Sequence, residues 1–109
     1  MVKEGILAVL MLGDLNFTGI QFLSTLQKNQ YDPSFPFKNT EQTIKKSDLV
    51  IANMEGPFTF SEWSKESEGK KWRFRQLPAF AKAIKEAGIG VLLLANNHIA
   101  DAGTPSVSM

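Results

Sequence analysis

Residues 49–57 read LVIANMEGP, an apolar segment that runs without a break into a polar one. Two other segments have the same form: residues 6–12 (ILAVLML) continue into GDLN, and residues 91–95 (VLLLA) continue into NNHIAD. None of them alternates polar with apolar residues, as a strand with one face in water does. Short apolar runs of this kind are typical of strands that are buried on both faces of a parallel sheet. We therefore predict parallel strands at residues 6–12, 49–52 and 91–95.

The segments between these strands carry apolar residues at helical spacing. The clearest helix is predicted at residues 78–87, which begin with a proline and end before a glycine, the residues favoured at these two positions. A second is predicted at residues 39–46, where Asn39 and Gln42 have the spacing of a capping box, and a third around residues 17–26. Parallel strands need crossover connections, which helices supply. The predicted fold class is α/β, a layered sheet of parallel strands with crossover helices.

The composition excludes several classes of protein. With 109 residues the chain has room for one small domain, and its 43% hydrophobic and 21% charged residues rule out wholesale disorder. Twelve basic and 11 acidic residues leave a net charge of +1, which makes nucleic acid an unlikely partner on charge alone. The absence of cysteine excludes disulfides, thiolate metal sites and a cysteine nucleophile. No apolar run approaches the roughly 20 residues of a membrane span, and no signal peptide is recognisable.

Polar side chains follow each predicted strand. The carboxyl ends of parallel strands meet at one edge of a sheet, where ligands bind. Two carboxylates about 4 Å apart repel by about 4 kcal/mol at an effective dielectric near 20, and no Lys or Arg lies within four residues after any of the strands. Carboxylate, amide and imidazole groups are ligands of Mn, Mg, Fe and Zn, so a divalent metal ion is the favoured cofactor. The residues gathered at this edge are Asp14, Asn53, Glu55, Asn97, His98 and Asp101. Each alone has a simpler structural reading, since an Asp after a strand is commonly a turn or cap residue.

The order of these motifs resembles the bacterial capsule-synthesis family, the CapA or poly-γ-glutamate synthesis (PGA_cap) family, which is related to the calcineurin-like metallophosphoesterases. The most specific blocks are NMEGP at residues 53–57 and ANNH at residues 95–98, and the matching order extends from about residue 6 to residue 103. The resemblance implies a layered, metallophosphatase-like α/β sandwich. Residues 1–109 would then form a single partial domain, its N-terminal portion.

The resemblance also implies chemical roles. It makes Asp14, Glu55 and Asn97 the metal ligands and His98 and Asp101 the catalytic residues, with Asn53 and Asn96 as substrate or supporting residues. Separately from the resemblance, we assign Arg75 as a residue that binds the anionic group of the substrate at this edge. The resemblance implies metal-assisted hydrolysis or transfer at a phosphoryl centre, on an anionic polymer or phosphoester substrate, in capsule or poly-γ-glutamate synthesis. Family members are commonly associated with the cell envelope.

The sequence departs from the wider superfamily and from the family itself. Asn16 stands where classical phosphoesterases have a histidine after the first strand, and the sequence after Gly103 does not resemble the family's continuing helix. We therefore expect a truncated product with an incomplete site, weak metal binding and low solubility.

Two alternatives remain. Residues 70–75 (KKWRFR) would, on a strand, place Lys71, Arg73 and Arg75 on one face and aromatic residues on the other. Such a segment can hold a polyanion by charge and stacking, although an amphipathic strand with a solvated basic face is the simpler reading. The other alternative is an inactive remnant. Nucleotide-binding glycine motifs and a Gly-x-Ser-x-Gly motif are absent, which argues against a Rossmann enzyme and a serine hydrolase.

Overall fold

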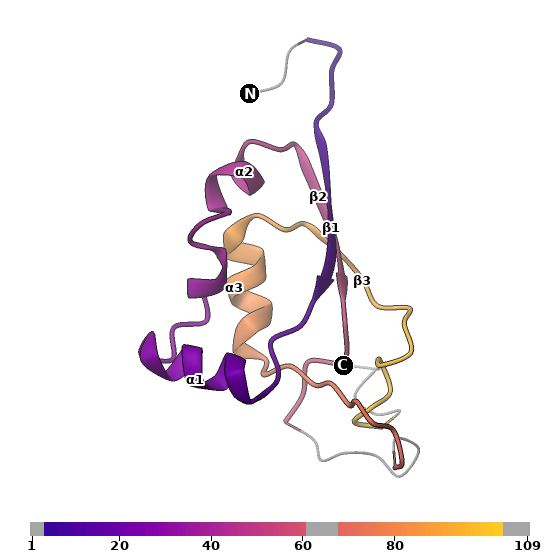
Figure 1. Ribbon diagram of the computed structural model, residues 1–109. Helices are drawn as coiled ribbons and strands as arrows, with labels where there is room; N and C mark the ends of the chain where they lie inside the picture. Colours follow the sequence, from indigo (N-terminus) through magenta and orange to yellow (C-terminus); the bar gives the residue numbers. More distant parts are fainter. Residues whose placement is uncertain (1–3, 61–67, 104–109) are drawn as a thin grey trace.

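A parallel three-stranded sheet forms the centre of the computed structural model, which describes residues 4–60 and 68–103 (Figure 1). The strands lie in the order β1-β2-β3, and both pairings are parallel, so the predicted α/β class is confirmed. The elements in chain order are β1 (Val9–Leu15), α1 (Ile20–Lys28), the 3₁₀ helix η1 (Phe35–Phe37), α2 (Glu41–Lys45), β2 (Leu49–Met54), α3 (Ala79–Ala87) and β3 (Val91–Leu93).

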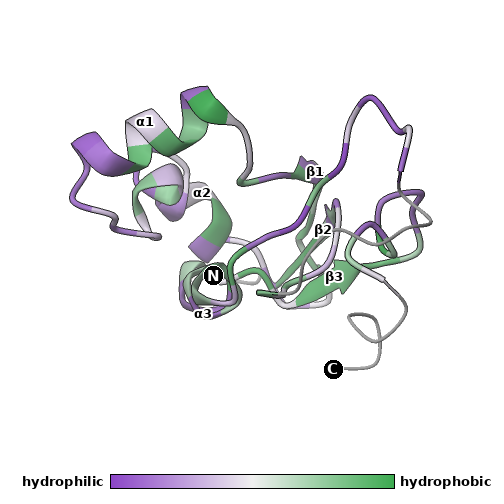
Figure 2. Ribbon diagram, turned by 90° about the horizontal axis from the view of Figure 1, so that it is seen from below, coloured by the Kyte–Doolittle hydropathy of each residue, from purple (hydrophilic) through white to green (hydrophobic). Residues whose placement is uncertain are grey.

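The helices all lie on one side of the sheet (Figures 1 and 2). On β2, Val50, Ala52 and Met54 face this layer and are buried. The opposite face is open: Met11, beside Ile51, is 72% exposed. Burial of the strands on both faces was therefore a wrong prediction for the described residues, because these residues place helices against only one face.

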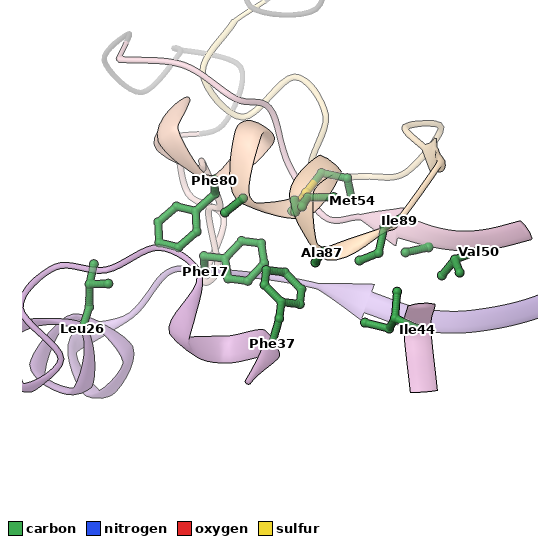
Figure 3. Close-up of a cluster of buried hydrophobic side chains, with 12 residues drawn as sticks. Phe17, Leu26, Phe37, Ile44, Val50, Met54, Phe80, Ala87 and Ile89 are labelled. Carbon is green, nitrogen blue, oxygen red and sulfur yellow. The ribbon is translucent and has the colours of Figure 1, made fainter. Parts of the chain in front are cut away.

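The core lies between the helices and the covered face of the sheet. Phe17 stacks on Phe80 with ring centroids 4.6 Å apart and packs edge-on against Phe37 at 5.9 Å. Figure 3 shows these rings beside Ile44 and Met54, which come from α2 and β2. Side chains from four separate elements therefore hold the helical layer on the sheet.

Helix α3 follows its sequence signals closely. It begins after Pro78 and ends at Gly88, whose φ of 105° is a left-handed value that glycine adopts without strain. The capping-box prediction for the second helix was wrong. Helix α2 is capped at Thr40, not Asn39, and without a side-chain hydrogen bond. The reason is that η1 immediately precedes it, and the Thr40 N–H bonds to the Phe37 carbonyl.

Strand β1 runs further along the sequence than its apolar run. It begins at Val9, so Ile6 and Leu7 lie outside it and are more than half exposed. It continues through Asp14 to Leu15, and the Asp48 carboxylate accepts a hydrogen bond from the Ala8 N–H just before it. Backbone pairing to β2 thus overrides the polar character of its last residues. Strand β3 is shorter than predicted and ends at Leu93.

A bulge in β1 changes which way its side chains face. Met11 pairs with Ile51 and Asp14 with Asn53, so two β1 residues oppose one β2 residue between these pairs. Leu12, at the bulge, packs against the core, as Leu10 does before the bulge and Leu15 does after it. Without the extra residue, strict alternation would turn Asp14 toward the helices. The bulge instead places Asp14 on the open face, next to Asn53.

Candidate functional site

Hydrogen bonds join polar side chains from the ends of all three strands. Asn53 Nδ2 donates to Asp14 Oδ1 at 2.8 Å, and Asn96 Nδ2 donates to Asn53 Oδ1 at 3.3 Å. Asn96 Nδ2 also donates to the Met54 carbonyl, and its Oδ1 accepts the His98 N–H at 3.0 Å. The structure therefore brings together strand ends that lie up to 84 residues apart (14 to 98), as parallel topology predicts.

His98 lies between two carboxylates. Its Nδ1 is 2.6 Å from Asp101 Oδ2, and its Nε2 is 3.8 Å from Glu55 Oε1. The Phe74 ring packs on the imidazole with centroids 4.2 Å apart, and His98 is 7% exposed. These contacts fix the ring so that Nε2 faces Glu55 and the polar cluster.

Asp101 is a fully buried carboxylate with hydrogen-bond donors around it. Besides His98, it accepts the Phe74 N–H at 2.8 Å and forms an ion pair with Lys70 Nζ at 2.7 Å. Burial by itself raises the pKa of Asp101, but the hydrogen bonds from Lys70, Phe74 and His98 outweigh it and hold this pKa below its usual value. Asp101 is therefore ionised at neutral pH and can hold the imidazole by a charge-assisted hydrogen bond.

Lys70 is a site residue that the sequence analysis missed. It was assigned to the polyanion-binding alternative, but its Nζ contacts Asp101 and donates to the Asn97 carbonyl at 2.7 Å. No local signal could have revealed these partners, which lie 27 and 31 residues away. Residues 70–75 form no strand, so the predicted alternation of basic and aromatic faces on a strand was wrong. The segment is held by the Asp101 side chain instead of a neighbouring strand.

Gln76 is a second residue that the sequence did not reveal. It is fully buried, and its Oε1 accepts the Phe17 N–H at 2.7 Å. Its Nε2 donates to the Glu55 carbonyl at 2.7 Å and to Asn16 Oδ1 at 3.3 Å. Gln76 thus connects the segments that follow β1 and β2. Asn16 is used in this connection and in bonds from the Thr18 backbone and hydroxyl.

Two further predicted site residues are Asn97 and Arg75. Asn97 is exposed, and the contact that the structure records for it uses its backbone carbonyl. Arg75 is half-buried and lines a neighbouring cavity. Their predicted roles as metal ligand and substrate residue stay predictions.

The oxygen and nitrogen ligands at this edge are of the chemical types that bind divalent ions, but they do not form a preorganised coordination site. Among residues 4–60 and 68–103, no three His, Asp or Glu side chains are grouped closely enough to hold a metal ion. Asp14 is exposed and offers a carboxylate oxygen beyond the one bonded to Asn53. The 3.8 Å between Glu55 and His98 exceeds a hydrogen bond. Any ion here would therefore need amide oxygens or water to complete its coordination.

Comparison with known proteins identifies the family. The family model described as "Bacterial capsule synthesis protein PGA_cap" matches residues 8–109. The chain belongs to the PGA_cap family. A curated relative, the "Capsule biosynthesis protein CapA" of Bacillus anthracis, is 34% identical over 76 residues, an alignment covering 69% of this chain. That alignment covers 18% of the relative, so the PGA_cap chain spans under a fifth of its length.

The other comparisons add two observations. No solved structure matches the PGA_cap chain. Within the part of the chain that the structure describes, no helix combines the length and apolar character needed to cross a membrane. The family match confirms the resemblance drawn from the residue motifs, whose NMEGP and ANNH blocks both lie within residues 8–109.

Proposed function

We propose that this PGA_cap chain carries part of a divalent-cation-dependent phosphoester site that acts in capsule biosynthesis. The main support is the hydrogen-bonded convergence of Asp14, Asn53, Asn96 and His98 at one end of the sheet, with Glu55 facing His98. The name of the relative, a capsule biosynthesis protein, supports the biological role.

The carboxylates of Asp14 and Glu55 are the proposed metal ligands, joined by the amide oxygen of Asn97. Their oxygens are of the kind that Mn, Mg, Fe and Zn accept. When bound, such an ion lowers the pKa of a coordinated water and neutralises charge on phosphoryl oxygens. Because no compact group of three ionisable ligands is present among the described residues, the proposed affinity is weak.

His98 is the proposed proton carrier. Ionised Asp101 accepts the Nδ1–H, which leaves Nε2 as the nitrogen that faces the cluster. A histidine held in this way can donate a proton from Nε2 to a leaving oxygen. Phe74 covers one side of the ring, which limits the directions from which water reaches it.

Manganese titration of the whole chain tests the metal site. Isothermal titration calorimetry should give saturable heat at millimolar Mn²⁺, and Asp14→Asn should weaken binding at least about fivefold through loss of a charged ligand. Glu86→Gln is the matched control, because this carboxylate is exposed on α3 and pairs only weakly with Lys82, at 3.6 Å. Absence of heat at millimolar Mn²⁺ would refute the metal site.

Hydrolysis of p-nitrophenyl phosphate tests the reaction. We expect slow, Mn²⁺-dependent release of nitrophenolate that chelator abolishes and that His98→Asn reduces at least about 100-fold, the usual contribution of a general acid. Binding of Mn²⁺ without hydrolysis would leave a metal-binding remnant and refute the enzymatic proposal.

A further inference from the structure

A cavity of about 720 Å³ has in its lining Phe74, the residue that packs on His98 of the polar cluster. Its walls come from residues 16–19, Leu23 of α1, residues 72–75 and 77, and Phe80 of α3. Its volume falls within the range of about 300–1,000 Å³ that is usual for small-molecule sites. Four aromatic residues belong to its lining: Phe17 and Phe80, which are buried in the core, half-buried Phe74, and exposed Trp72.

Two residues that line the cavity are also connected to the candidate site. Phe74 lines the cavity and also packs on the His98 imidazole. Asn16 lines it too and accepts a hydrogen bond from Gln76, which in turn donates to the Glu55 carbonyl. A molecule in the cavity would therefore lie one side chain away from His98.

The lining contains both aromatic and cationic side chains. Arg73 and Arg75 supply the guanidinium groups. Guanidinium groups bind phosphate through paired hydrogen bonds and stack on aromatic faces. Trp72 is 63% exposed and Leu23 52% exposed, so apolar surface remains open for a ligand to cover.

We propose that this cavity binds a phosphomonoester of an aromatic alcohol, with the ring against the aromatic lining and the phosphate toward the arginines. The proposal rests on the proposed function, because it adds a substrate class to the same site. The cavity would select esters by their alcohol part, while the neighbouring cluster acts on the phosphate. Aromatic stacking and paired guanidinium bonds both contribute, so the whole ester should bind better than either of its parts.

Calorimetric titration of the metal-free chain with three probes tests the cavity. The probes are 1-naphthyl phosphate, inorganic phosphate and 1-naphthol. We expect 1-naphthyl phosphate to bind at least about tenfold more tightly than either of the other two, a difference that calorimetry resolves.

A matched pair of variants on α1 locates the binding. Leu23→Glu places a carboxylate at the cavity and should weaken 1-naphthyl phosphate at least about fivefold by charge repulsion and loss of apolar contact. Gln27→Glu makes the same charge change on an exposed residue of α1 outside the lining, and should change affinity less than about twofold.

The outcomes separate the cavity from the metal site. Equal affinity for 1-naphthyl phosphate and inorganic phosphate would overturn the aromatic part of the proposal, and equal affinity for 1-naphthol would overturn the anionic part. A dimer in sedimentation that Leu23→Glu dissociates, with no probe bound by the wild type, would overturn it by showing the cavity closed between copies. Failure to bind Mn²⁺ with intact, selective 1-naphthyl phosphate binding would refute the metal site and support the cavity.

Discussion

Asp101 is buried as a charged group because hydrogen-bond donors from several segments converge on it. Lys70, the Phe74 N–H and the His98 ring occupy its two oxygens. A carboxylate without such partners would favour its protonated form on burial. The residue positions the imidazole and anchors residues 70–74, so it links the candidate chemistry to the wall of the cavity.

Replacing Lys70 should destabilise the chain. In Lys70→Met the apolar stem is kept but the ion pair to buried Asp101 is lost, so the free energy of unfolding should fall by about 2 kcal/mol, the usual value for a hydrogen bond to a charged group. Lys71→Met is the control, because Lys71 is exposed and its Nζ lies over the Trp72 ring, and it should change stability by under about 0.5 kcal/mol. Urea unfolding measures both variants, and equal effects would contradict the assigned role of Lys70.

The low pKa of Asp101 predicts loss of stability in acid. Burial raises this pKa, but hydrogen bonds from Lys70, Phe74 and His98 lower it further, so the folded value lies below the unfolded one of about 3.9. The contribution is therefore present above about pH 4 and is lost as pH falls through the folded pKa. The pKa of Asp32 is also lowered, mainly by hydrogen bonds from Ser34, so Asp32 contributes to the loss of stability over the same acidic pH range.

A comparison with Asp101→Asn isolates this contribution. Urea unfolding between pH 6 and pH 2 should show a smaller loss of stability for the variant than for the wild type, because the variant has no carboxyl group at residue 101 to titrate. The contribution of Asp32 is the same in both proteins and cancels in the comparison. Parallel curves for the two proteins would show that Asp101 does not titrate on unfolding as the structure predicts.

At the level of elements, two irregular backbone positions shape the site. The β1 bulge turns Asp14 to the open face beside Asn53. The turn after β2 uses Gly56 at φ 100°, where an added Cβ would lie 2.8 Å from the Phe74 carbonyl oxygen. This close approach brings the segment that carries Phe74 against the end of β2.

Alanine substitutions at Gly56 and at Gly13, which lies in the β1 bulge, should have unequal effects on stability. Gly56→Ala requires a strained φ and a clash with backbone, and we expect the free energy of unfolding to fall by about 1–3 kcal/mol. Gly13→Ala meets nothing within 4 Å and should change it by under about 0.5 kcal/mol. Chemical denaturation of both variants decides the matter, and a tolerated Gly56→Ala would argue against the close packing of residues 56 and 74.

On the scale of the whole molecule, residues 4–60 and 68–103 cover one face of the sheet and leave the other open. Its open face carries large apolar side chains, among them Met11 at 72% and Leu93 at 51% exposed. Parallel sheets are ordinarily covered on both faces. Exposed apolar strand surface promotes association between chains, so the expectation of low solubility remains a prediction.

The same substitution on the two faces should separate their roles. Val9→Thr, on the open face, should change the free energy of unfolding by under about 0.5 kcal/mol and improve solubility. Val50→Thr, 2% exposed against the helices, buries a hydroxyl and should cost about 1–3 kcal/mol. Thermal or urea unfolding with turbidity measurements checks both. A large cost at Val9 would indicate that the open face is covered in solution.

The local sequence determined the element types. Apolar runs without alternation predicted three parallel strands, and the proline and glycine around α3 predicted its limits. Parallel pairing then predicted that Asp14, Asn53 and His98 would meet. These features depend on residues that are neighbours in sequence, or on a rule of sheet topology that holds for any sequence.

Only the tertiary structure decided what each polar side chain contacts. Lys70 and Gln76 find partners 21 to 60 residues away, and nothing in their own surroundings indicates those partners. The bulge that turns Asp14 outward depends on the register between two strands, and the one-sided burial depends on where the helices pack. Contacts between distant segments are chosen by the packing of the whole chain, so periodicity, composition and local motifs do not encode them.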